Sequence, residues 1–131
     1  MTLEELTQAA MAVVGEFTSS PDCTVGGVAA ALETTSGSVY TGVCIDTACS
    51  LGFCAEHSAI AEMLKARESE IRMIVAVMAD GSIVPPCGRC RELIWQVNTR
   101  NAATVVIVGR DRAVSLSELL PFPWPRQPIS N

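Results

Sequence analysis

Two short cysteine motifs carry the residue types that could bind a metal. Cys54-Ala55-Glu56 stands at one predicted helix start, and Pro86-Cys87-Gly88-Arg89-Cys90 stands at another, further along the chain. Cys87 and Cys90 are three residues apart, so both sulfurs project from the same side of a first helical turn. The positive end of a helix dipole favours the thiolate, which is the form that binds zinc. Three thiolates from Cys54, Cys87 and Cys90 leave one tetrahedral position open, which is typical of catalytic zinc.

Glu56 follows the first of these cysteines by two residues, and we expect it to move protons. Zinc lowers the pKa of a bound water, and a carboxylate beside that water can take its proton. A zinc-bound hydroxide would then attack the substrate, while the same carboxyl delivers protons to a ring nitrogen and to a leaving amine. Together these roles describe the hydrolytic deamination of an amino-substituted N-heterocycle.

The cysteine motifs also allow a non-catalytic interpretation, either a redox dithiol or a structural zinc module. A redox motif of the thioredoxin kind follows the first strand of a βαβ unit and requires no third cysteine. A structural zinc requires a fourth protein ligand, for which Cys44, Cys49 and His57 are the candidates. We expect Cys23, Cys44 and Cys49 to be small buried apolar residues. His57, the single histidine, is either a hydrogen-bond donor to a metal-bound thiolate or an exposed polar residue.

The elements that must position these residues follow from the periodicity of apolar side chains. Helical spacing predicts helices over 3–18, 54–67, 88–98 and 115–120. Strands are predicted over 24–33, 37–45, 71–79 and 104–108, with a short one near Val114. A hairpin followed by crossovers predicts a mixed sheet of about five strands with helices on both faces, a three-layer α/β/α domain. A flavodoxin-like doubly wound sheet is the alternative, but the leading hairpin and the lack of a glycine-rich first βα turn disfavour it.

Composition excludes several classes of function. The chain has 131 residues, which we interpret as one domain over 1–131, with 49% apolar and 18% charged residues and a net charge of −5. This charge argues against nucleic-acid or anionic-membrane partners, which bind basic patches. No apolar stretch approaches the about 20 residues that span a bilayer. The acidic, amphipathic N-terminal segment is unlike a signal peptide, so we expect a cytoplasmic protein with reduced cysteines.

The two motifs, Cys-x-Glu and the later Pro-Cys-x-x-Cys, match the signature of zinc-dependent base deaminases. Over almost its whole length the chain resembles the small cytidine deaminase and blasticidin S deaminase family. This resemblance implies a cytidine-deaminase-like fold, catalytic zinc on Cys54, Cys87 and Cys90, Glu56 as the proton shuttle and a small-molecule substrate. It also implies a homotetramer or homodimer whose active sites lie at subunit contacts. Apolar positions such as Ile60, Leu64 and Trp95 are available to bury in such an assembly.

The chain departs from this family at the residues expected to bind ribose. The family places Asn and Glu where this sequence has Cys44 and Asp46, and a thiol cannot replace the donors and acceptor of an amide. As the substrate, the sequence therefore favours a blasticidin-like aminoacyl nucleoside, or a free or non-standard base, over cytidine or deoxycytidine.

Other positions complete the expected site. The arginine that often follows the family glutamate is His57, which leaves Arg91 as the residue expected to offset the thiolate charge. Resemblance to the family's C-terminal lid suggests that Trp124, in its proline-rich tail, stacks on the substrate, with Phe53 and Phe122 as other aromatic walls. The candidate substrate-binding residues are Cys44, Asp46, Phe53, Ala55, Pro85 and Trp124.

Overall fold

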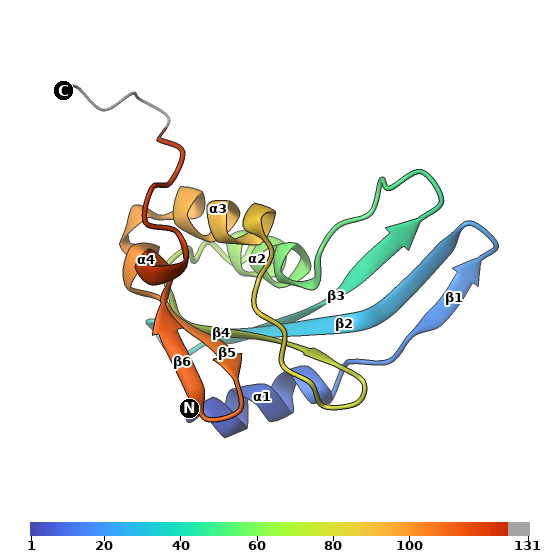
Figure 1. Ribbon diagram of the computed structural model, residues 1–131, viewed down its shortest axis with the longest axis horizontal. Helices are drawn as coiled ribbons and strands as arrows, with labels where there is room; N and C mark the ends of the chain where they lie inside the picture. Colours follow the sequence, from blue (N-terminus) through green and yellow to red (C-terminus); the bar gives the residue numbers. More distant parts are fainter. Residues whose placement is uncertain (126–131) are drawn as a thin grey trace.

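The computed structural model describes residues 1–125, which form a mixed sheet with helices on both faces (Figure 1). The helices are α1 (Leu3–Met11), α2 (Ala55–Lys65), α3 (Gly88–Val97), the 3-10 helix η1 (Thr99–Ala103) and α4 (Leu116–Leu119). The strands are β1 (Phe17–Ser20), β2 (Cys23–Thr34), β3 (Val39–Thr47), β4 (Ile71–Met78), β5 (Val105–Gly109) and β6 (Arg112–Ser115). No helix among these residues is long and apolar enough to cross a membrane.

The long strand β2 organises the sheet, because it pairs with three other strands. Its first residues pair with β1, its remainder pairs antiparallel with β4, and β3 pairs along its other edge. Beyond β4 lie β5 and β6. The pair β4–β5, connected through α3, is the one parallel pairing within residues 1–125, so the doubly wound alternative is wrong.

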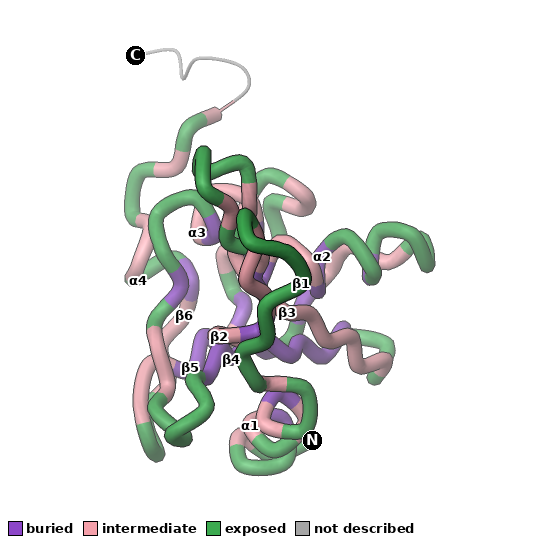
Figure 2. The backbone as a smooth tube through the Cα atoms, turned by 90° about the vertical axis from the view of Figure 1, so that its right-hand side faces the viewer, coloured by how far each residue is buried: buried purple, intermediate pink, exposed green. Residues whose placement is uncertain are grey.

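Two apolar clusters fill the spaces between the three layers. Leu6 and Ala10 of α1 pack with Met73, Val75 and Val77 on one face of β4. On the other face, Ile71, Ile74 and Ala76 pack with buried residues of α2 and α3. This strand, which the sequence predicts, is therefore buried on both faces. Figure 2 shows the buried residues gathered along the central strands, with exposed segments at the periphery.

The first predicted helix is too long, and the sheet has one strand more than expected. Thr2 caps α1, because its hydroxyl accepts from the Glu5 N–H at 3.1 Å. However, the helix ends at Met11, and the Gly15 N–H donates instead to the Gly26 carbonyl at 2.9 Å. The β-prone segment Phe17–Ser20 then pairs with the start of β2. Tertiary pairing thus outweighs the helical spacing that extended the prediction to residue 18.

A close contact between β3 and α2 sets the position of the first cysteine motif. A Cβ on Gly42 would lie 2.4 Å from the Ala59 backbone nitrogen and 2.5 Å from the Ser58 Cβ. The absence of a side chain at this position of β3 therefore allows α2 to lie directly against the strand. Cys54 is the N-cap of α2, so this contact also fixes the helix end that carries it.

Buried Asn101 plays the corresponding role near α3. Its side chain donates to the Ile94 carbonyl at 2.9 Å and to the Ser69 carbonyl at 3.0 Å, and it accepts from the Ile71 N–H at 2.8 Å. These bonds tie the last turns of α3 to the start of β4. Sequence reasoning did not identify this residue, because each of its partners except Ile94 lies about 30 residues away in the chain.

Candidate active site

The two cysteine motifs meet where α2 and α3 begin. Cys54 is the N-cap of α2 and Cys87 is the N-cap of α3, both with extended backbone, and Cys90 lies fully buried in the first turn of α3. The Cys87 Sγ lies 3.4 Å from the Cys54 Sγ and 3.4 Å from the Cys90 Sγ. The predicted juxtaposition of three thiols at two helix N-termini is therefore present.

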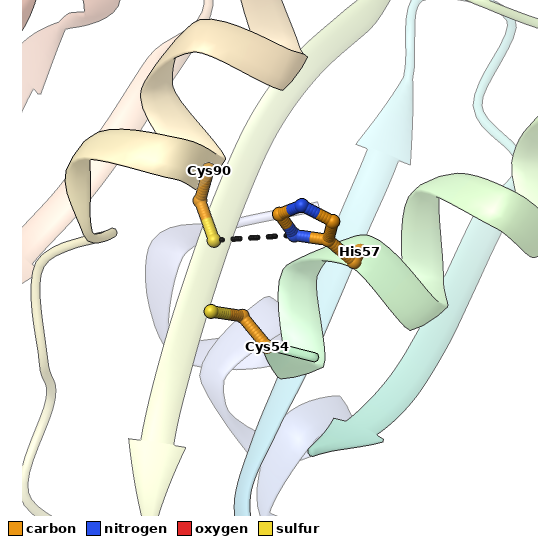
Figure 3. A group of neighbouring side chains, drawn as sticks. All are labelled: Cys54, His57 and Cys90. Carbon is orange, nitrogen blue, oxygen red and sulfur yellow. Dashed lines mark hydrogen bonds between the residues drawn. The ribbon is translucent and has the colours of Figure 1, made fainter. Parts of the chain in front are cut away.

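His57 adds a nitrogen to this cluster. Its Nδ1 forms a hydrogen bond of 3.5 Å with the Cys90 Sγ (Figure 3). The ligand atoms of Cys54, His57 and Cys90 lie within 4.8 Å of one another, and Figure 3 shows these side chains turned toward a common point. Thiolate and imidazole are the donors that zinc prefers, so this group is positioned to bind zinc. The sequence left His57 as either a hydrogen-bond donor to a thiolate or an exposed polar residue. Its hydrogen bond with Cys90 agrees with the first of these interpretations.

Burial and neighbouring groups perturb the titratable side chains of this cluster. Burial raises the pKa of Cys90, and the nearby Glu56 charge raises it further. Burial likewise raises the pKa of Cys54, aided by its hydrogen bond with Cys87. Burial alone would raise the pKa of Cys87, but hydrogen bonds from the Cys90 backbone and thiol lower it. Burial, followed by the Arg89 charge, lowers the pKa of His57.

A cavity of about 430 Å³ opens beside the cysteine cluster. Cys54, Cys87 and Glu56 line it, and the Glu56 side chain is only 5% exposed. Glu56 therefore shares this cavity with two of the three cysteines. Five of the six candidate substrate-binding residues also line this cavity: Cys44, Asp46, Phe53, Ala55 and Pro85.

Cys44 and Asp46 form a small hydrogen-bonded unit on this cavity wall. The Val28 N–H donates to the Cys44 Sγ at 3.2 Å, and the Cys44 thiol donates to the Asp46 Oδ2 at 3.6 Å. Cys44 is buried as expected, but Cys23 is only half-buried and Cys49 is exposed. The expectation of burial is wrong for these two, because they stand at the end of the β2–β3 ribbon, beyond the layers that α1 and α2 cover.

Arg91 and Arg89 have different surroundings. The Arg91 guanidinium donates to the carbonyls of Pro86 at 2.8 Å and Leu119 at 3.2 Å, so it joins the segment before α3 to α4. It is Arg89 that lines the cavity and whose charge acts on His57. Its place between the two cysteines of α3 is the signal that could have identified it.

Trp124 does not line the cavity of its own chain. Its side chain is 75% exposed, and its backbone N–H donates to both Glu92 carboxylate oxygens at 3.2 Å. Phe122 is 92% exposed. Of the three aromatic walls expected from the sequence, Phe53 alone lines this cavity.

Comparison with known proteins gives a consistent result. Residues 1–108 match the model of the cytidine and deoxycytidylate deaminase zinc-binding region. The cytidine deaminase of Burkholderia pseudomallei is 28% identical, with a TM-score of 0.75 over 95% of this chain and 100% of that one. The cytidine deaminase of Mycobacterium tuberculosis is 22% identical, with a TM-score of 0.80 over 95% and 98% of the two chains. That of Mycobacterium leprae is 24% identical, with a TM-score of 0.78 over 93% and 99%.

Proposed function

The chain belongs to the family of zinc-dependent cytidine and deoxycytidylate deaminases, and from that premise we propose that it hydrolyses the exocyclic amine of a cytosine-like ring. The observation that carries this proposal is the buried Glu56 carboxyl beside three thiols, at the wall of a cavity of about 430 Å³. The reaction consumes water, replaces the amino group on the ring carbon with a carbonyl oxygen, and releases ammonia.

Cys54, Cys87 and Cys90 would hold the zinc in this proposal. When bound, zinc supplies a Lewis acid that makes water nucleophilic at neutral pH. The Glu56 carboxylate takes the proton that this water gives up and transfers it to the ring nitrogen. It then moves a second proton to the departing amine, so one side chain serves both directions of transfer. Burial of Glu56 keeps bulk water away from these transfers.

The hydrogen bonds of Cys44 and Asp46 support a choice among the possible ring substituents. The Cys44 thiol already donates to Asp46 and accepts from Val28, so it offers no free donor for a pair of sugar hydroxyls. Of this pair, Asp46 remains to accept from a substituent, and its carboxylate suits an ammonium or a single hydroxyl. These contacts support a blasticidin-like aminoacyl nucleoside or a free or non-standard base ahead of cytidine and deoxycytidine.

Assembly into a homodimer or homotetramer is part of the same proposal. Phe122 and Trp124 are exposed and stand away from the cavity of their own chain. A second copy could receive them, since a symmetric assembly places the same surface of each chain against another. We place the activity in the cytoplasm, where unpaired thiols remain reduced. The net charge of −5 supports a small molecule over nucleic acid as the partner.

Ammonia release from a panel of amino-substituted rings tests the proposed reaction. Zinc-loaded protein would be assayed with cytosine, cytidine, deoxycytidine, blasticidin S, aminotriazines and oxidised or rearranged purines. We expect turnover of at least one member, abolished by Glu56→Gln and restored by zinc after chelation. Turnover of cytidine alone would reverse the proposed order of substrates. A protein that binds zinc but deaminates none would favour the alternative, a non-catalytic zinc or redox dithiol module.

A further inference from the structure

The cluster of Cys54, Cys87, Cys90 and His57 offers more ligand atoms than a catalytic zinc uses. Three sulfurs and one imidazole nitrogen lie in a continuous chain of contacts, in the order Cys54, Cys87, Cys90 and His57. A catalytic zinc takes three protein ligands and keeps a fourth position for water. One of the four donors therefore stands in excess when the site is active.

The arrangement on the two helices shows which donors are interchangeable. His57 follows Cys54 by three residues on α2, as Cys90 follows Cys87 on α3, so each helix offers a pair of donors from its first turn. Cys54 and Cys90 belong both to the Cys54–Cys87–Cys90 set and to the Cys54–His57–Cys90 group. The two sets differ in one member, which is the exposed Cys87 in one set and the half-buried His57 in the other.

The distances from the Cys90 Sγ suit either Cys87 or His57 as the third ligand. With zinc–sulfur bonds of about 2.3 Å and zinc–nitrogen bonds of about 2.0 Å, tetrahedral geometry separates two sulfurs by about 3.8 Å and a sulfur from a nitrogen by about 3.5 Å. The Cys87 Sγ is 3.4 Å from the Cys90 Sγ, and the His57 Nδ1 is 3.5 Å from the same sulfur. Both donors therefore lie near a tetrahedral spacing from the Cys90 Sγ.

From this geometry we propose that His57 is a substitute zinc ligand, which takes the position of Cys87 when that thiol is lost. While Cys87 binds the metal, His57 keeps its hydrogen bond with the Cys90 Sγ, because a fourth protein ligand would close the position that water needs. When the exposed Cys87 is removed, imidazole from the same cluster completes a Cys54–His57–Cys90 set. The inference rests on the proposed zinc deaminase site but concerns retention of the metal.

Metal content of three variants of the full chain tests this inference. Cys87→Ser, His57→Leu and the double variant would be dialysed against a chelator that leaves zinc on the wild type. We expect each single variant to keep about one zinc per chain and the double variant to lose it. Cys90→Ser is the matched control, and we expect it to lose zinc because Cys90 belongs to both sets. Serine is a favourable N-cap, so Cys87→Ser should preserve α3.

Cobalt spectra give a second readout that does not depend on activity. In Cys87→Ser, the sulfur-to-cobalt charge-transfer intensity per metal should fall by about one third, since one of three thiolates is gone. His57→Leu should leave that intensity unchanged.

Three results would overturn the inference. They are loss of zinc by Cys87→Ser in a folded protein, loss of zinc by His57→Leu alone, and retention of zinc by the double variant. Failure of the proposed function would instead appear as a wild type that binds zinc without releasing ammonia from any substrate.

Discussion

At the scale of single residues, the role proposed for Glu56 most sharply separates a deaminase from a zinc module. Its carboxyl is buried beside the thiols and lines the cavity. Glu56→Gln fills the same space but cannot accept a proton, so we expect kcat to fall by at least about 100-fold. Glu56→Ala should be as poor. Zinc content should remain unchanged in both variants, as measured by metal analysis beside a steady-state ammonia assay.

The matched control for this prediction lies on the same helix. Glu62 of α2 is exposed and does not line the cavity. Glu62→Gln should therefore turn over substrate at the rate of the wild type. Near-normal turnover by Glu56→Gln would remove Glu56 from the mechanism.

A second carboxyl, Glu68, predicts how stability depends on pH. Ser36, Tyr40 and Thr34 donate hydroxyl hydrogens to it, the last at 2.8 Å. These bonds lower the pKa of Glu68 from 4.5 to about 2. Because the folded pKa lies below the ordinary value, the stabilisation is present above about pH 4.5 and is lost as the pH falls toward 2.

Urea unfolding of the metal-free protein measures this effect without contribution from zinc release. Glu68→Gln should lower the urea midpoint at pH 7, and the difference from the wild type should shrink as the pH falls below 4.5. Glu16→Gln, which changes an exposed carboxyl, should unfold as the wild type does. A difference between Glu68→Gln and the wild type that stays constant from pH 7 to pH 2 would contradict the assignment.

At the scale of elements, local sequence signals were sufficient to predict where the helices start. They were insufficient to predict which other elements each one contacts. Cys54, Cys87 and Cys90 could be placed from the sequence because spacing within one helical turn fixes which side chains share a face. The strand β1 and the hydrogen bonds of Asn101 could not be predicted, because both depend on partners brought together only by folding. The bond from Arg91 to the Leu119 carbonyl could not be foreseen for the same reason, since Leu119 lies on another element.

The contact between β3 and α2 gives a prediction at this scale. A Cβ at Gly42 would meet backbone and side-chain atoms of α2 at 2.4 to 2.7 Å. Gly42→Ala must therefore push α2 from the sheet, and overpacking of this kind costs about 1–3 kcal/mol of unfolding free energy. Because α2 carries Cys54 and Glu56, we expect kcat to fall in the protein that remains folded.

Gly88→Ala provides the comparison for Gly42→Ala. Gly88 is the first residue of α3 and lies between the metal motif residues Cys87 and Arg89, yet a Cβ there meets no atom within 4 Å. We expect unchanged or slightly higher stability, since alanine is the better helix former. Denaturant unfolding of both variants separates the two effects. Equal stability of Gly42→Ala and the wild type would show that α2 is free to move.

At the scale of the whole molecule, the apolar surface is distributed unevenly. Ile60, which the sequence suggested as a spare apolar position, is buried within its own chain, and Trp95 packs against the same core. Leu64 is exposed, as are Phe122 and Trp124 beyond α4. Exposed apolar side chains therefore lie in the C-terminal segment more than on the faces of α2 and α3, and Leu51 and Phe17 are exposed as well.

The C-terminal segment supplies the last prediction, which concerns how one chain completes the site of another. Pro121, Pro123 and Pro125 restrict the backbone around Trp124, so its ring is presented with little entropy left to lose on binding. The ring is 75% exposed and outside its own cavity, whose aromatic wall is Phe53 alone. If Trp124 enters the cavity of a partner and stacks on the substrate, the contact is worth roughly 1–3 kcal/mol.

Trp124→Ala, or truncation after Leu120, should then raise KM by roughly 5- to 150-fold, since each 1.4 kcal/mol corresponds to about a tenfold change. Zinc content should not change, because the metal cluster lies at the starts of α2 and α3. Sedimentation of the wild type should show a dimer or tetramer. A truncated protein that stays assembled and keeps its KM would show that Trp124 contacts no substrate. A fully active monomer would show that each chain encloses its cavity alone.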